Sequence, residues 1–144
     1  ALDTRLRAWH RADERSLRLA TVPGIGVIGA TALAMKVPDP GVFRSGRHFA
    51  AWIGLTPKDH STAGRQQLGG ITRAGDETVR RLLVSGAMAV IQRAKPGRTS
   101  PWLLGLLARK PRKLVAVALA NKTARIAWAL MMRGESYRRP AMAG

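Results

Sequence analysis

Ser61 is the residue with the clearest potential for covalent chemistry, because cationic side chains stand close to it in the sequence. Lys58 and His60 precede it, and Arg65 and Arg73 follow it. A serine hydroxyl can attack a phosphodiester, and cations can hold the phosphate and stabilise the charge that develops on it. The same residues also fit a solvated surface loop. A hydrolase triad is not predicted, since the sequence has no Gly-x-Ser-x-Gly elbow.

A second candidate site is the turn that contains Gly24 and Gly26, in the run LATVPGIG at residues 19–26. A hydrophobic-Pro-Gly-Ile-Gly turn between two helices is typical of the helix-hairpin-helix of non-specific DNA binders. There the glycines expose backbone N–H groups at a helix N-terminus to a phosphate. The alternative is a tight turn whose glycines only allow two helices to pack closely.

The acidic residues do not form a metal-binding set, because they are scattered or stand side by side. A two-metal nuclease needs three or four carboxylates that converge on a cation pair. Asp76 and Glu77 are better explained as favourable charges at a helix N-terminus. We therefore predict no metal and no cofactor in this chain, whose eight acids are Asp3, Asp13, Glu14, Asp39, Asp59, Asp76, Glu77 and Glu135.

The balance of charge indicates a polyanionic partner. The 144 residues include 25 Lys and Arg against 8 Asp and Glu, a formal net charge of +17. Nucleic acid is the first partner that this excess suggests, and an anionic membrane surface is the second. The membrane is the weaker alternative, because the apolar helix faces are committed to a core and no apolar run approaches the roughly 18 residues of a membrane span. The absence of cysteine excludes disulfides, zinc fingers and thiol nucleophiles.

Basic residues are dense in the C-terminal helices, where they suit contacts to a nucleic-acid backbone. Lys122 and Arg125 stand out, because they lie about one helical turn apart beside Asn121. Ordinary solvated helix faces are the alternative for the other cations. The tryptophans occupy helical apolar positions, so they are expected in the core rather than stacked on bases; they are Trp9, Trp52, Trp102 and Trp128.

The hydrophobic pattern predicts a compact, mainly α-helical domain with one long irregular segment in its centre. Asp76 is expected to cap a helix that ends near residue 95, and Ser100 to cap a short helix with Pro101 at its first position. Residues 56–70 are polar, contain glycine and lack periodicity, as is typical of a functional loop. The helix after Ser100 is expected to run over residues 102–108, and further helices are expected over residues 2–19, 26–35 and 43–55 and from 111 onward.

Several ordered motifs together resemble the C-terminal transposase domain of insertion-sequence family 110, particularly its 1111 subgroup. The resemblance covers about residues 16 to 133. The runs that carry it are TVPGIG at 21–26, FRSGRHFAAWIGLTP at 43–57, HSTAGR at 60–65, LGGITRAGD at 68–76, RRLL at 80–83 and VALANKTARIAW at 117–128. One departure is Ala63, which stands where many relatives have glycine.

The resemblance implies a recombinase that cleaves and rejoins DNA through a serine, with a covalent 5′-phosphoserine intermediate. Ser61 aligns with that nucleophile, and the resemblance places Mg²⁺ in an N-terminal RuvC-like domain that lies outside this chain. We therefore expect that these 144 residues do not cleave DNA unaided. The residues expected to bind phosphate or DNA are Gly24, Gly26, Lys58, His60, Arg65, Arg73, Arg80, Lys122 and Arg125.

The resemblance also implies partners and a domain layout. Double-stranded DNA and a structured bridge RNA are the expected ligands, a dimer or tetramer is the expected assembly, and the cytoplasm, at the bacterial nucleoid, is the expected location. Residues 1–20 would be the end of a coiled coil or linker helix. Residues 21–134 would be the transposase domain, with the helix-hairpin-helix-like element at 19–35, and 135–144 a flexible tail. The alternative function is a non-catalytic helix-hairpin-helix module that binds DNA.

Overall fold

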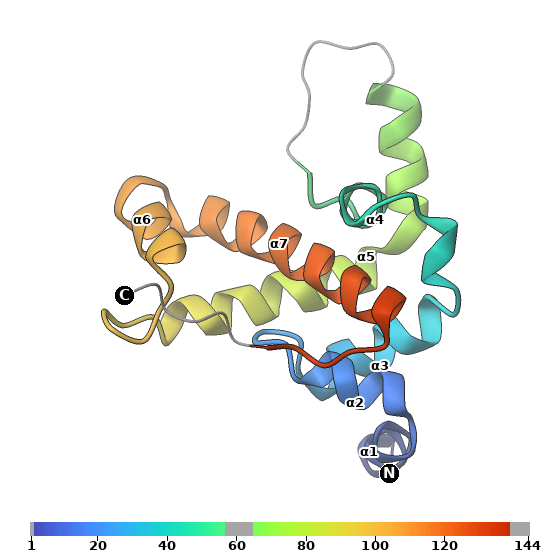
Figure 1. Ribbon diagram of the computed structural model, residues 1–144. Coiled ribbons are helices and arrows are strands. Elements are labelled where there is room, and N and C mark those ends of the chain that lie inside the picture. The colour runs from blue at the N-terminus through green and yellow to red at the C-terminus, as the bar shows by residue number, and fades with distance from the viewer. Residues whose placement is uncertain (1, 57–64, 139–144) are drawn as a thin grey trace.

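The fold consists of helices packed around two long central ones (Figure 1). The computed structural model describes the backbone of residues 2–56 and 65–138, and the side chains of residues 3–56 and 77–138. These residues form seven α-helices and one 3₁₀ turn, with no strand among them, which confirms the predicted mainly α fold. The elements are α1 Leu2–Ala12, α2 Glu14–Ala20, α3 Gly26–Lys36, η1 Pro40–Val42, α4 Gly46–Ile53, α5 Arg65–Gln92, α6 Pro101–Arg109 and α7 Arg112–Arg133.

The core lies where α5 and α7 run side by side. Helix α4 packs against both of them, α6 packs against α7, and α2 and α3 pair at the other end of the domain. Alanines at three- and four-residue steps face the core from α7, and their small side chains let the helix lie close to its neighbours. The buried alanines of α7 are Ala116, Ala120, Ala124 and Ala127.

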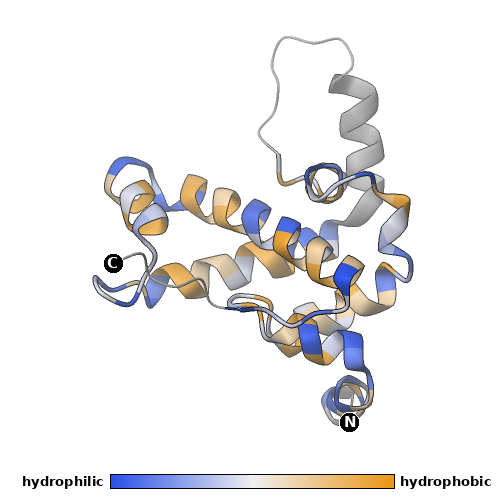
Figure 2. Cartoon of the chain, viewed as in Figure 1, coloured by the Kyte–Doolittle hydropathy of each residue, from blue (hydrophilic) through white to orange (hydrophobic). Residues whose placement is uncertain are grey.

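Helix α7 is both the central core helix and the most apolar long segment described. Although Lys122 and Arg125 interrupt its apolar sequence, its length and composition alone would allow it to cross a membrane. Of its most apolar 18-residue stretch, 44% is buried inside the domain. A core helix of a soluble protein has the same length and composition, and the hydropathy colouring in Figure 2 shows α7 with hydrophilic and hydrophobic residues interspersed.

The expected single helix over residues 2–19 is divided at Asp13. The Asp13 carboxylate accepts a hydrogen bond from the backbone N–H of Ser16 at 2.8 Å, so Asp13 caps α2 and ends α1. Next to this break, His10 Nδ1 and Ser16 Oγ lie 2.6 Å apart in a buried hydrogen bond. The prediction of one continuous helix was therefore wrong, because the cap and the buried polar pair stabilise a corner.

The long central helix begins eleven residues earlier than expected. Asp76 does not cap it, because α5 starts at Arg65 and passes through Gly75 and Asp76. A glycine inside a helix costs only about 1 kcal/mol relative to alanine. The later turns of α5 are anchored by Val79, Leu83, Ala87 and Ile91 in the core. Residues 65–70, expected in the irregular segment, are helical, and residues 57–64 lie outside the described residues.

Other local predictions are confirmed. Helix α3 covers the expected residues 26–35 and one more. Ser100 Oγ accepts a hydrogen bond from the backbone N–H of Leu103 at 3.2 Å, with Pro101 at the first helical position. Beyond α7, the backbone N–H of Tyr137 donates to Thr21 Oγ1 at 2.8 Å. Residues 135–138 therefore lie against the start of the predicted transposase domain, and residues 139–144 are outside the described part.

Candidate nucleic-acid interface

The predicted reaction loop is anchored at its N-terminal side by α4 and α7. Gly54 ends α4 in the left-handed conformation, with φ of 97°, and the N–H of Leu55 donates to the carbonyl of Ala50 at 3.0 Å. The side-chain amide of Asn121 on α7 then donates to the carbonyl of Leu55 at 3.2 Å. The backbone is thus fixed close to the segment that contains Ser61.

The predicted nucleophile and the four cations expected to hold phosphate beside it are not tested by the structure. Lys58, His60 and Ser61 lie outside the described residues. Arg65 and Arg73 are placed on α5 by the backbone, but their side chains are also outside the described part. The roles of these five residues therefore stay predictions.

Lys122 and Arg125 lie on the part of α7 that faces away from the buried alanines. The Lys122 ammonium stands 4.2 Å from the ring centroid of Trp102 on α6, a cation–π contact. Arg125 is exposed, while its backbone packs closely on Gly46 at the first turn of α4. A Cβ added to Gly46 would lie 3.2 Å from the Cα of Arg125, so only a very small residue fits there. The structure brings these two predicted site residues to one helix surface.

Arg80 lies on α5 in a small charge cluster. Glu77 pairs with Arg80 at 3.6 Å and with Arg81 at 2.5 Å. One carboxylate therefore offsets part of the charge of two arginines. This arrangement leaves the predicted DNA contact of Arg80 untested.

Gly24 and Gly26 have different surroundings in the structure. Both have positive φ, 94° and 64°. A Cβ added to Gly86 of α5 would lie only 1.6 Å from the carbonyl oxygen of Gly24, so the turn and α5 touch backbone to backbone. A Cβ added to Gly26 would meet nothing within 4 Å. Close packing explains Gly24, whereas Gly26 opens to the surface.

Gly26 borders a groove of about 460 Å³ between α3 and α5. Ile25 stands at the N-cap of α3 and makes no side-chain hydrogen bond to the first N–H groups of the helix. Arg7 and Arg93 also line the groove. An uncapped helix N-terminus with two arginines beside it is compatible with a bound anion. Helices α3 and α7 do not pack against each other, so this groove is separate from Lys122 and Arg125.

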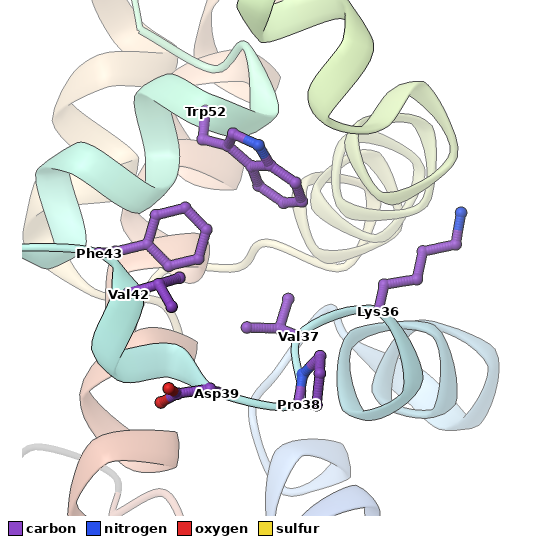
Figure 3. Close-up of a pocket in the computed structure, with 7 residues that line it drawn as sticks. All are labelled: Lys36, Val37, Pro38, Asp39, Val42, Phe43 and Trp52. Atoms are coloured by element: carbon purple, nitrogen blue, oxygen red, sulfur yellow. The ribbon is translucent and has the colours of Figure 1, made fainter.

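A second cavity, of about 310 Å³, is mainly apolar. It lies between the end of α3, the η1 turn and α4, and Figure 3 shows Phe43 and Trp52 on one side of it and Val37 on the other. The rings of Phe43 and Trp52 are 5.2 Å apart between centroids.

Among the described residues no group of three or more His, Asp or Glu could hold a metal ion.

The tryptophans divide into two kinds. Trp128 Nε1 donates to the carbonyl of Pro40 at 2.9 Å, and Trp52 stacks with Phe49, so both are integrated into the fold. Trp102 is different, since 40% of its surface is exposed. The prediction that the tryptophans belong to the core is confirmed for Trp52 and Trp128, which pack against it. It was wrong for Trp102, because α6 packs through Leu103 and leaves its neighbour outside.

Charge is distributed unevenly along the chain. From residue 78 to residue 134 the sequence contains no Asp or Glu. This stretch covers the whole C-terminal half of α5 and all of α6 and α7. Its basic residues are Arg80, Arg81, Arg93, Lys95, Arg98, Arg109, Lys110, Arg112, Lys113, Lys122, Arg125 and Arg133.

Comparison with known proteins identifies relatives of the chain. Residues 16–102 match the protein family described as the transposase IS116/IS110/IS902 family. The chain is 65% identical over 140 residues to a putative transposase of Sinorhizobium fredii, covering 95% of the chain and 36% of the relative. It is 50% identical to a probable family 20 transposase of Pseudomonas aeruginosa, covering 95% of the chain and 41% of the relative. It is 38% identical to the transposase for insertion sequence element IS1111A of Coxiella burnetii, covering 92% and 37%. The chain thus spans about two fifths of the length of these relatives.

Proposed function

Since the chain belongs to the transposase IS116/IS110/IS902 family, we propose that it supplies the serine nucleophile with which a DNA transposase cleaves and rejoins strands. The observation that carries the proposal is the family match over residues 16–102, which includes Ser61 and its flanking cations. The bond from Asn121 to Leu55 supports it, because a reaction loop needs a fixed support.

The proposed chemistry is a reversible phosphoryl transfer. Ser61 Oγ attacks the phosphorus, an Oγ–P bond forms, and the bond from phosphorus to the 3′ oxygen breaks. The hydroxyl proton ends on the leaving 3′ oxygen, so a 5′-phosphoserine and a free 3′ hydroxyl result. Attack by the 3′ hydroxyl of another strand reverses these changes and restores Ser61. The phosphodiester energy is retained in the intermediate, so rejoining needs no nucleotide cofactor.

The cationic residues of the proposed site divide into two groups. Lys58, His60, Arg65 and Arg73 would hold the scissile phosphate near Ser61. Lys122, Arg125 and Arg80 would contact the DNA backbone from α7 and α5. Backbone contacts of this kind position DNA without reading its sequence.

The finer parts of the proposal come from the family resemblance. A bridge RNA would guide the reaction at the nucleoid in the cytoplasm, and two or four copies would assemble on the DNA. Magnesium would be bound by carboxylates of an N-terminal RuvC-like domain outside this chain. The chain would therefore act only as part of the longer protein.

A second candidate function is non-catalytic DNA binding through the helix-hairpin-helix-like turn. The open position of Gly26, the uncapped start of α3, and Arg7 and Arg93 in the same groove favour it. In this alternative the segment around Ser61 would contact DNA without cleaving it. The two functions share salt-dependent DNA binding, so affinity alone does not separate them.

The test uses the full-length transposase with labelled DNA that carries its element ends. The wild type is expected to form a protein–DNA adduct that survives denaturation, and Ser61→Ala is expected to lose it with DNA affinity nearly unchanged. Ser136→Ala is the matched control, because Ser136 is an exposed serine that lines neither cavity. An adduct that persists in Ser61→Ala contradicts the assignment. Intact binding with no adduct in the wild type supports the second function.

A further inference from the structure

Trp102 is an exposed aromatic residue on the surface formed by α6 and α7. It occupies the second position of α6, and 40% of its surface is accessible to solvent. The other described tryptophans have protein partners or are less exposed. The indole combines an apolar ring with a polar N–H, and such side chains are enriched where a protein meets a ligand or a partner.

The contact that Trp102 does make is with a cation. Lys122 approaches its ring to 4.2 Å from the centroid. The contact joins the first turn of α6 to the middle of α7, and both helices are held by buried residues such as Leu103 and Ala120. The indole and the ammonium therefore form a preorganised pair, defined here as the Trp102–Lys122 pair.

The two helices that carry this pair also bear exposed apolar and basic residues. Leu114 and Val117 on α7 are 58% and 36% exposed. The turn between α6 and α7 carries further cations, namely Arg109, Lys110, Arg112 and Lys113. The whole stretch from residue 78 to residue 134 lacks a carboxylate. A partner for this surface must be anionic and must also offer apolar faces.

Charge excludes a second copy of the same surface as the occupant, because two surfaces without carboxylates repel each other. Duplex DNA satisfies the cations but not the indole, since its bases are stacked inside and its phosphates face outward. An unpaired strand satisfies both, because each base offers a π-face and each phosphate a charge. The commitment to DNA rather than RNA rests on the proposed function, in which strand exchange requires DNA to leave its duplex.

We propose that the Trp102–Lys122 pair is a binding site for an unpaired DNA strand. A base stacks on the Trp102 indole, and the Lys122 ammonium, which already lies at that ring, contacts the adjoining phosphate. The site lies on α7 together with Arg125, so the strand would continue along a surface already proposed to bind phosphate.

The experiment measures the affinity of the full-length transposase for short labelled oligonucleotides of one mixed sequence. The probes are single-stranded DNA, single-stranded RNA and duplex DNA. Trp102→Leu is expected to weaken binding of single-stranded DNA by about tenfold or more, as is typical for loss of one stacked base. Duplex affinity should change by less than about twofold, since backbone contacts dominate there. Met35→Ala is the control, because Met35 is similarly exposed on α3.

A second measurement covers the case in which Trp102→Leu fails to fold. Stacking on an indole quenches its fluorescence, so the wild type should lose emission when single-stranded DNA is added. Trp102→Phe, which keeps an aromatic ring, should retain part of the affinity but show less quenching. These readouts do not use Ser61, so they can succeed or fail independently of the adduct assay.

Three outcomes overturn the proposal. Equal losses on single-stranded and duplex DNA would mean that Trp102 only supports the helices. A loss confined to RNA would assign the site to RNA. Unchanged affinity for all three probes would show that Trp102 contacts no nucleic acid; if binding to added vesicles of anionic phospholipid then falls in Trp102→Leu, the site belongs to a membrane surface.

Discussion

Asn121 on α7 and Leu55 after α4 are joined by a hydrogen bond, from the side-chain Nδ2 of one to the backbone oxygen of the other, across 3.2 Å. The two residues are 66 positions apart in the sequence. Leu55 is only 1% exposed, so its carbonyl has little access to water as an alternative partner. The bond therefore couples the start of the proposed reaction loop to the helix that carries Lys122 and Arg125.

Asn121→Ala is expected to lower the free energy of unfolding by about 1–3 kcal/mol, because it leaves a buried acceptor without its donor. It should also slow adduct formation by the full-length transposase more than it weakens DNA binding. Urea denaturation and the adduct assay measure the two effects. Lys113→Ala, an exposed site on the same helix, should change stability by less than about 0.5 kcal/mol. Equal effects of Asn121→Ala and Lys113→Ala would show that the bond contributes neither to stability nor to adduct formation.

Two glycine-to-alanine substitutions in helices should have opposite signs. At Gly86 the new Cβ would overlap the carbonyl oxygen of Gly24 at 1.6 Å, and both groups are too rigid to yield without moving a helix. Gly86→Ala should therefore destabilise the protein by about 3 kcal/mol or more. Gly105 in α6 has nothing within 4 Å of its added Cβ. Gly105→Ala should stabilise by about 0.5–1 kcal/mol, because alanine loses less conformational entropy. Thermal unfolding of the two variants checks both signs.

Local signals in the sequence predict the elements whose ends are decided locally. Ser100 followed by Pro101 marks the start of α6, since cap and proline act within one turn. The same rule placed the start of α5 at Asp76, which was wrong, because the sequence does not distinguish an aspartate inside a helix from one that caps it. The break at Asp13 was missed because it depends on the buried pair of His10 and Ser16.

Contacts between distant residues limit what sequence shows of the site. Gly24 was recognised as a turn glycine, but its packing partner Gly86 gave no signal, because nothing in a single sequence links the two positions. Lys122 and Arg125 were proposed as site residues from their spacing and charge, and their role in binding stays a prediction. The exposure of Trp102 was not predicted. A tryptophan at an apolar position of a helix is expected in the core, and only the packing of α6 shows that this one lies outside it.

The N-cap of α6 provides a further test of local structure. Ser100→Ala removes the oxygen that accepts the N–H of Leu103 and should cost about 1 kcal/mol of unfolding free energy. Ser85→Ala, an exposed position within α5, should be neutral or slightly stabilising, because alanine has the higher helix propensity. Chemical denaturation of both variants makes the comparison. A cost at both positions would mean that hydroxyl loss, and not capping, is responsible.

The last prediction concerns the phosphate contact proposed for Arg125. For duplex DNA, the logarithm of the binding constant falls with the logarithm of salt concentration by about 0.9 for each phosphate that a protein neutralises. Arg125→Gln in the full-length transposase should therefore reduce the magnitude of that slope by about 0.9, the value for one phosphate. Binding is measured by fluorescence anisotropy between about 50 and 200 mM salt.

Arg81→Gln is the matched control for Arg125→Gln. Arg81 is an exposed arginine on a helix, but its charge is engaged by Glu77 at 2.5 Å. Its removal should leave the slope nearly unchanged, because an arginine held by a carboxylate displaces fewer counterions from DNA than an unpaired one. A slope that falls equally in both variants would indicate a diffuse effect of net charge. A slope that falls only in Arg125→Gln places a phosphate at the helix surface that Asn121 connects to the reaction loop.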